Sequence, residues 1–238
     1  MRGMVPQWLE KLLILQDRDA HRALLEKQLD AVPREREAAE RKIAGHRAAI
    51  EAAQHRVREL ELERSRLEQE IASVEEQVRK YRNQQIQVKK NEEYQALTHE
   101  IAATEARISE LEGAEIQVLY DLDTVRAKSA EVVATEKTEI AFQEKQIARM
   151  AEREVQLKVE LESARAAVEA ARSEVPLKSI SVYDRLASSL ALPVIVPLEG
   201  QKCTGCHLRV SAGVDAEVRG GGELTACDNC TRILYSEA

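Results

Sequence analysis

All four cysteines of this 238-residue chain lie after residue 200, in two Cys-x-x-Cys pairs. Cys203 and Cys206 form the first pair, Cys227 and Cys230 form the second, and twenty residues separate the two pairs. A tight turn of this kind presents two sulfurs on one side, and a β-hairpin between two such turns would bring all four sulfurs into one tetrahedral cage. The cysteines therefore predict a C4-type zinc ribbon that holds Zn²⁺.

A redox-active dithiol is the main alternative for either pair. A catalytic Cys-x-x-Cys usually lies at the start of a helix in a βαβ unit, and no such pattern surrounds these cysteines. His207, directly after Cys206, could replace one ligand, but with four cysteines present it fits better as an exposed or hydrogen-bonding side chain. A catalytic zinc normally mixes in His or carboxylate ligands and keeps an open position, so we expect a structural site whose loss unfolds the ribbon.

The chain before the ribbon has the composition of long helices. Aromatic residues make up 3% and charged residues 32% of the whole chain, as is typical of coiled coils. Mostly apolar residues recur with a 3-4 spacing from Arg36 to Val88, again from Tyr94 to Val125, and then, displaced by four residues, from Ile140 to Val175. Such a displacement is a stutter, which locally unwinds a coiled coil, so we expect a bend or looser packing near residues 125–140.

A new helix is predicted to begin between the first two of these seams. Asn91 can cap a helix whose first turn carries two carboxylates near the positive end of the helix dipole. Folding back near residues 84–93 would pair residues 4–90 with residues 92–176, two arms of nearly equal length, in an antiparallel hairpin. A single long helix that pairs with a second copy is the alternative, because periodicity does not identify the partner of a seam.

The predicted fold class is mainly α, a long antiparallel coiled-coil helical hairpin with a small C-terminal β zinc ribbon. Its three parts are the hairpin at 1–176, a short helix and linker strand at 177–200, and the C4 zinc ribbon at 201–238. Pro33 predicts a kink near residues 31–33, because proline lacks an N–H and disfavours helix in the residue before it. Residues 4–30 would then form a separate segment.

After the hairpin, the sequence predicts a short helix followed by short β-strands. Ser181 is the expected cap of the short helix, and residues 194–196 form a β-type run that leads toward the first cysteine pair. The strands and turns of a minimal ribbon are expected at residues 208–218, at the glycines 220–222, at residues 223–225 and at residues 232–235.

Charge and targeting signals limit the function classes. The formal net charge is −7 and the sequence pI is near 5.5, so the chain as a whole lacks the basic footprint of a bulk nucleic-acid binder. We find no secretory signal pattern and no apolar stretch of membrane-spanning length, and therefore expect a cytoplasmic protein. In a reducing cytosol the cysteines remain available to a metal.

One stretch of the acidic chain is basic. Residues 79–90 contain no acidic residue and carry the candidate partner or nucleic-acid binding residues Arg79, Lys80, Tyr81, Arg82, Lys89 and Lys90. This pole could meet phosphate groups or an acidic protein surface. The alternative is a solvated helix end whose lysines lie near the negative end of the helix dipole.

The sequence resembles a known bacterial family, the coiled-coil proteins with a C-terminal C4-type zinc ribbon. The resemblance rests on the run 91–101 in mid-coil, on Cys203-Thr-Gly-Cys-His207 and on the run 227–235, and it extends over essentially the whole chain. It implies a helical hairpin with the ribbon at its open end and Zn²⁺ as the cofactor.

The resemblance also implies regulation by binding. Some members of the family are described as nucleic-acid-binding proteins, and one flagellar member is associated with a flagellin transcript. Others are adaptors that bind the enhancer-dependent alternative sigma factor and a stator component of flagellar or type III export machinery. From residue 200 onward this chain has four Lys or Arg against five Asp or Glu, which departs from the basic ribbon expected of an RNA-binding member.

The sequence thus predicts a non-enzymatic adaptor that binds protein partners in transcription regulation or in flagellar or type III secretion. Direct RNA or DNA binding is the alternative function. An enzyme is disfavoured, because the chain shows no nucleophile–base pairing, no phosphate-binding glycine loop and no clustered His and carboxylate set.

Overall fold

The computed structural model describes residues 6–221 and 224–236. In chain order the elements are α1 (Gln7–Gln87), α2 (Asn91–Ser173), α3 (Leu177–Ser189), β1 (Ile195–Glu199), β2 (Lys202–Cys203), α4 (Ala212–Gly220), β3 (Thr225–Ala226) and β4 (Ile233–Tyr235). The chain divides into two compact units, one formed by Met1–Arg36 with Ala148–Ala238 and the other by Glu37–Ile147.

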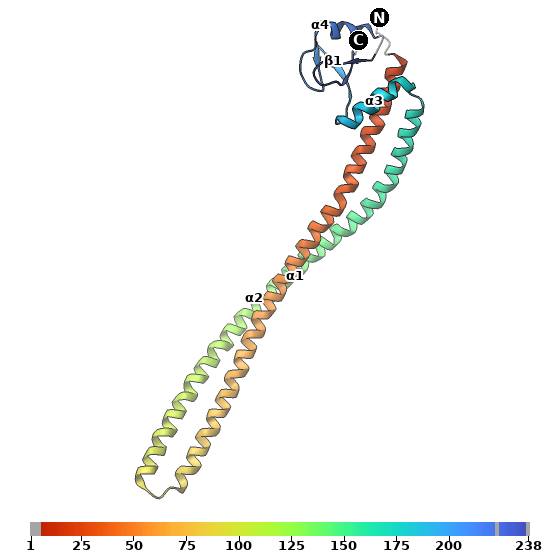
Figure 1. Cartoon of the computed structure of the whole chain (residues 1–238). Coiled ribbons are helices and arrows are strands. Elements are labelled where there is room, and N and C mark those ends of the chain that lie inside the picture. Colours follow the sequence, from red (N-terminus) through yellow and green to blue (C-terminus); the bar gives the residue numbers. More distant parts are fainter. Residues whose placement is uncertain (1–5, 222–223, 237–238) are drawn as a thin grey trace. The chain divides into compact units, whose positions relative to one another are not determined.

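The two long helices form an antiparallel coiled-coil hairpin. α1 ends at Gln87, α2 begins at Asn91, and the short turn between them reverses the chain (Figure 1). This confirms the predicted fold class and rules out one continuous helix through this region. The break lies inside the stretch where the sequence predicts a helix restart.

In the unit Glu37–Ile147, the arms pack along the predicted seam. Leu60 of α1 packs against Val118 and Leu122 of α2, all at most 8% exposed. Along α1, the seam positions from residue 39 to residue 85 are all buried or half-buried, as is Val88 just after the helix, whereas Arg36 at the start of the pattern is exposed. The 3-4 spacing therefore predicted the buried face of α1 almost residue by residue, because each such step returns a helix to the same face.

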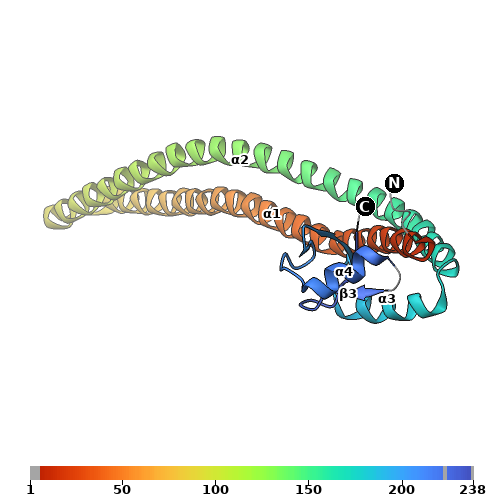
Figure 2. The ribbon, with the colours of Figure 1, turned by 90° about the horizontal axis from the view of Figure 1, so that it is seen from above.

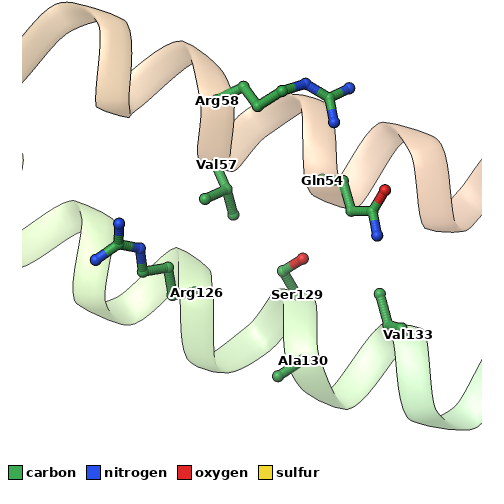
Figure 3. A pocket seen from close by; sticks show the side chains of 7 residues that line it. All are labelled: Gln54, Val57, Arg58, Arg126, Ser129, Ala130 and Val133. Carbon is green, nitrogen blue, oxygen red and sulfur yellow. The ribbon is translucent and has the colours of Figure 1, made fainter.

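The register shift in α2 lies at Val125, Ser129 and Val133, which all face the seam at two successive steps of four residues. A shallow depression of about 370 Å³ lies here between the helices. Figure 3 shows Val57 and Gln54 pointing from α1 toward Ser129 and Val133 of α2. Two steps of four rotate the seam away from the partner helix, and the depression is the looser packing that the shift predicts.

In the other unit, α1 continues without a break through Pro33. Residues 7–30 are therefore not a separate helix, so that expectation is wrong, whereas the kink near residues 31–33 stays a prediction. Val32 is only 2% exposed and belongs to an apolar cluster with Leu25, Leu157 and Leu161. Burial of these side chains offsets the helix hydrogen bond that proline cannot make.

The short helix α3 packs against the first turns of α1 (Figure 1). Tyr183 of α3 is completely buried, and its hydroxyl donates a hydrogen bond of 2.9 Å to the Oδ2 atom of Asp19. The helix begins at Leu177 after Pro176, four residues before the expected cap. Ser181 instead donates its hydroxyl to the carbonyl of Lys178 within the helix, so the predicted cap is wrong.

The ribbon contains a four-stranded sheet in the order β2-β1-β4-β3. β1 pairs parallel with β4 and antiparallel with β2, and β3 pairs antiparallel with β4. The sequence expectation of strands and turns across residues 208–218 is wrong, because residues 212–220 form α4, next to β3 in Figure 2. Ser211 caps this helix by accepting the N–H of Val214, and Gly221 ends it in the left-handed region at φ 67°.

Candidate metal centre and binding surfaces

The first cysteine pair lies on a tight turn that begins at the end of β2. The N–H of Cys203 donates to the carbonyl of Leu208 at 3.0 Å, and the N–H of His207 donates to the carbonyl of Cys203 at 2.7 Å. His207 completes the turn with a φ of 60°. The side chains of Cys203 and Cys206 leave this turn toward the same small core.

The second pair repeats the same hydrogen-bond pattern. The N–H of Cys227 donates to the carbonyl of Arg232 at 2.8 Å, and the N–H of Thr231 donates to the carbonyl of Cys227 at 2.9 Å. Thr231 takes the position of His207, with a φ of 63°. The two turns are therefore equivalent structures, as a site with two matching halves requires.

The four sulfurs meet at one point. They all lie within 4.8 Å of one another, with 3.7 Å between the Sγ atoms of Cys203 and Cys230 and 3.9 Å between those of Cys206 and Cys227. All four cysteines are free of disulfides. Tetrahedral coordination with Zn–S bonds of about 2.3 Å places sulfurs about 3.8 Å apart, so the spacing fits a zinc ion and is far longer than an S–S bond.

Burial and hydrogen bonds shift the pKa values of the cysteine thiols in different directions. Burial raises the pKa of Cys203 to about 12, and burial also raises the pKa of Cys227. Burial works in the same direction on Cys230, but the backbone N–H of Arg232 and neighbouring thiols bring the pKa of Cys230 down to about 7. A cation at this point would favour the thiolate form of all four sulfurs, because its positive charge compensates the negative charge that burial disfavours.

His207 is exposed and does not belong to the cluster of potential ligand atoms. In the described part of the chain, the four cysteines are the one group of three or more His, Cys, Asp or Glu side chains close enough to share a metal. The donor set is thus four sulfurs with no nitrogen or oxygen, which matches a closed structural zinc site rather than a catalytic one.

Arg232 is a residue of this region that sequence reasoning missed. Its guanidinium donates to the carbonyl of Pro193 at 2.9 Å and to that of Gly205 at 3.4 Å, and so joins the linker before β1 to the first turn. A Cβ atom at position 205 would lie 2.6 Å from Cδ of Arg232, so a larger residue there would require the arginine side chain to move. No periodicity or spacing marks an arginine for such a role.

Gln16 fastens β1 to the first turns of α1. Its Oε1 atom accepts the N–H groups of Val194 and Ile195 at 2.7 and 2.6 Å, and its Nε2 atom donates to the carbonyl of Ile195 at 2.9 Å. The side chain is buried and acts as a short piece of neighbouring strand. These hydrogen bonds hold the start of the ribbon sheet against the base of the hairpin.

The predicted basic residues lie around the hairpin turn, in the unit Glu37–Ile147. Lys80 pairs with Glu76 at 2.8 Å and Lys90 with Glu93 at 3.2 Å, while Arg82 pairs with Glu105 of the opposite helix. Tyr81 is half-buried at the seam, and its hydroxyl accepts a hydrogen bond from Gln77.

Arg79 and Lys89 are both exposed, and in the described part of the chain neither forms an ion pair with an acidic side chain. Next to the turn lies an open depression of about 470 Å³ lined by Gln84, Gln87, Val88, Glu93, Ala96 and Leu97. The structure thus brings the basic residues to one region, with part of their charge compensated by neighbouring carboxylates.

A helical hairpin that carries a four-cysteine ribbon defines a class of coiled-coil zinc-ribbon proteins. Residues 15–190 match the family described as the CT398-like coiled coil hairpin domain, and residues 202–234 match the C4-type zinc ribbon domain. The chain therefore belongs to the CT398-like coiled-coil hairpin family. This architecture indicates a structural or binding role rather than a catalytic one.

Three solved structures share the fold over nearly their whole length. CT398 from Chlamydia trachomatis is 23% identical, with a TM-score of 0.80 over 96% of this chain and 97% of that one. A protein from Mycobacterium smegmatis is 17% identical, with a TM-score of 0.68 over 99% and 100% of the two chains. HP0958 from Helicobacter pylori is 20% identical, with a TM-score of 0.56 over 98% and 99%.

At these identities the likeness concerns the fold alone. No curated protein sequence matches the chain. Among the described residues, no helix combines the length and the apolar character that crossing a membrane requires.

Proposed function

We propose that this protein is a non-enzymatic adaptor that binds protein partners in transcription regulation or in flagellar or type III secretion. Its ribbon holds Zn²⁺ through Cys203, Cys206, Cys227 and Cys230 as a structural ion. The observation that carries this proposal is the convergence of four sulfurs from two equivalent turns, on a ribbon that Gln16 fastens to a helical hairpin. Such a scaffold presents binding surfaces, and its four-sulfur site is of the closed, structural kind.

The proposed partner surfaces are the ribbon and the basic residues around the hairpin turn. We also propose a cytoplasmic location, because transcription takes place in the bacterial cytoplasm and export machinery is reached from it. Direct RNA or DNA binding is the second candidate, and the observation that favours it is the pair of exposed cations at Arg79 and Lys89. The net charge of −7 weighs against it, because phosphate binding depends on neutralising cations.

Pull-down of the zinc-loaded full-length protein from its own cell lysate, with and without nuclease, separates the two candidates. A defined sigma factor or export component that is recovered in equal amount after nuclease treatment supports the adaptor. Recovery of nucleic acid, with the proteins lost on nuclease treatment, refutes the adaptor and supports nucleic-acid binding.

The salt dependence of any nucleic-acid binding provides the matched control. For phosphate-driven binding, replacing Arg79, Lys80 and Arg82 by Gln reduces the slope of log affinity against log salt by about one for each phosphate that is no longer neutralised. A triple variant at Lys145, Arg149 and Lys158, cations on α2 away from the turn, leaves that slope unchanged.

The metal assignment has its own measurement. We expect the purified protein to contain about one zinc per chain, and a variant with Cys206→Ser and Cys230→Ser to contain essentially none. Zinc in the variant at the level of the wild type would refute the assignment of ligands.

A further inference from the structure

α2 carries three large apolar side chains on an exposed face between residues 112 and 123. Ile116, Leu119 and Tyr120 are 66%, 38% and 71% exposed. Their spacing of three and four residues places them side by side on one helix face. Val118 and Leu122, at 8% and 1% exposed, face α1, so Ile116 and Tyr120 lie on the side of α2 that points away from its partner helix.

The charged residues of α2 around these three side chains are all acidic. Between Arg107 and Arg126 the sequence contains five acidic residues and no basic one, the acidic residues being Glu110, Glu112, Glu115, Asp121 and Asp123. Glu112 lies four residues before Ile116 and Asp123 three residues after Tyr120, so both share the exposed face with the apolar group.

Little inside the chain compensates these charges. Arg107 contacts Glu70 of α1 at 3.0 Å and Glu110 at 3.2 Å, and Arg126 contacts Glu61 of α1 at 2.6 Å. In the described part of the chain, Glu112, Asp121 and Asp123 take part in no ion pair and are exposed. The face defined by residues 112–123 therefore presents apolar surface inside a field of unpaired carboxylates.

A second exposed apolar pair on α2 shows that exposure alone does not create this combination. Val155 and Val159 are 64% and 68% exposed and also stand four residues apart. Their neighbours carry both signs of charge, and Lys158 pairs with Glu154 at 2.6 Å. This pair has the character of an ordinary solvated helix face, and it offers a matched control.

We propose that the face of α2 formed by residues 112–123 binds a basic amphipathic helix of another protein. The apolar side chains of that helix pack on Ile116, Leu119 and Tyr120, and its Lys or Arg side chains pair with the surrounding carboxylates. Nucleic acid does not fit here, because the four carboxylates between residues 112 and 123 repel a polyanion. Two copies of this face do not fit each other, because the same repulsion acts between them.

Fluorescence anisotropy with a defined probe tests the proposal on the full-length zinc-loaded protein. The probe is a labelled helical peptide of about 18 residues with Leu on one face and Lys on the other. Two further peptides serve as probe controls, one with Glu in place of every Lys and one with the same composition scrambled so that no apolar face forms.

The proposal expects the Lys peptide to bind, and the Glu and scrambled peptides to bind at least about tenfold more weakly. Replacing Ile116 and Tyr120 by Ser weakens binding of the Lys peptide at least about tenfold. The same change at Val155 and Val159 leaves binding unchanged. Replacing Glu112 and Asp123 by Gln and Asn weakens binding about threefold or more at low salt, and the difference shrinks as salt screens the charges.

Equal binding of the scrambled peptide, or binding that survives loss of Ile116 and Tyr120, overturns the proposal. Sedimentation equilibrium covers the remaining occupant: a wild-type dimer that becomes a monomer when Ile116 and Tyr120 are replaced would show that a second copy covers the face, which also overturns it. Circular dichroism verifies that each variant stays helical. The face is separate from the ribbon and the basic turn, so its failure leaves the proposed function standing.

Discussion

Replacing Gln16 by Leu should release the start of the ribbon sheet from the base of the hairpin. Leucine has a similar volume but cannot form the three hydrogen bonds that the amide makes with Val194 and Ile195. Two backbone N–H groups then lose their acceptor at a buried site. At about 1–2 kcal/mol for each unsatisfied group, the local cost is about 2–4 kcal/mol.

Hydrogen exchange measures this cost directly. A local destabilisation of about 2–4 kcal/mol corresponds to about 30- to 700-fold faster exchange of the amides at Val194 and Ile195. The amides of the hairpin seam, for example near Leu60 and Leu122, should keep their protection. Replacing Gln117 by Leu is the matched control, because this exposed amide donates its hydrogen bond to Asp121 of its own helix and not to the ribbon.

Unchanged exchange at Val194 and Ile195 in the Gln16→Leu protein would refute the reasoning, provided that the protein stays folded. It would mean that β1 is held by its strand partners and the apolar cluster alone. Faster exchange throughout the chain would refute it in another way, since the loss would then be global rather than local.

Three further predictions concern other parts of the molecule. A chelator should unfold the ribbon while α1 and α2 stay helical, because the buried core cluster of the ribbon consists of seven side chains and two of them are cysteines. Limited proteolysis measures cleavage after residue 200, and the far-ultraviolet circular dichroism spectrum measures the helix content. A ribbon that stays protease-resistant in the chelator contradicts this prediction. Replacing Tyr183 by Phe removes the hydrogen bond to Asp19, but Asp19 keeps its ion pair with Arg22 at 3.0 Å. The free energy of unfolding, measured in urea, should therefore fall by about 1–2 kcal/mol. A fall of about 4 kcal/mol or more, the size expected of a cavity mutation, would mean that Asp19 depends on the tyrosine alone. Replacing Ser129 by Leu fills the depression at the register shift, so the free energy of unfolding of the hairpin should rise by about 1 kcal/mol and its melting temperature should increase. A lower melting temperature would show that the seam there cannot accept the larger side chain.

The cysteine spacing and the helical periodicity could be interpreted from sequence because both are local or repeating signals. Two Cys-x-x-Cys turns specify their own geometry within a few residues, and a 3-4 repeat over many turns defines a buried face without knowledge of its partner. The break near Asn91 was visible for the same reason, since it interrupts the repeat.

Single positions inside the pattern were less predictable. Pro33 signalled an interruption, yet α1 continues through it because Val32 and Leu25 are packed against α2. Residues 208–218 were expected to form strands and turns of the ribbon, yet residues 212–220 form a helix that Ser211 and Gly221 cap. A short segment has weak intrinsic preference, so tertiary packing decides its state.

The sequence by itself determined the helical periodicity, the seam of α1, the place of the helix break and the grouping of four cysteines in two Cys-x-x-Cys pairs, and it favoured the hairpin over one long helix. Only the tertiary structure decided the parallel pairing of β1 with β4, the hydrogen bonds of Gln16 with the start of β1 and the hydrogen bond from Arg232 to the carbonyl of Gly205. These features join residues that are far apart in the chain, and no local repeat encodes them. Each depends on which backbone groups remain unsatisfied once the helices and strands have packed, and that is known only from the folded protein.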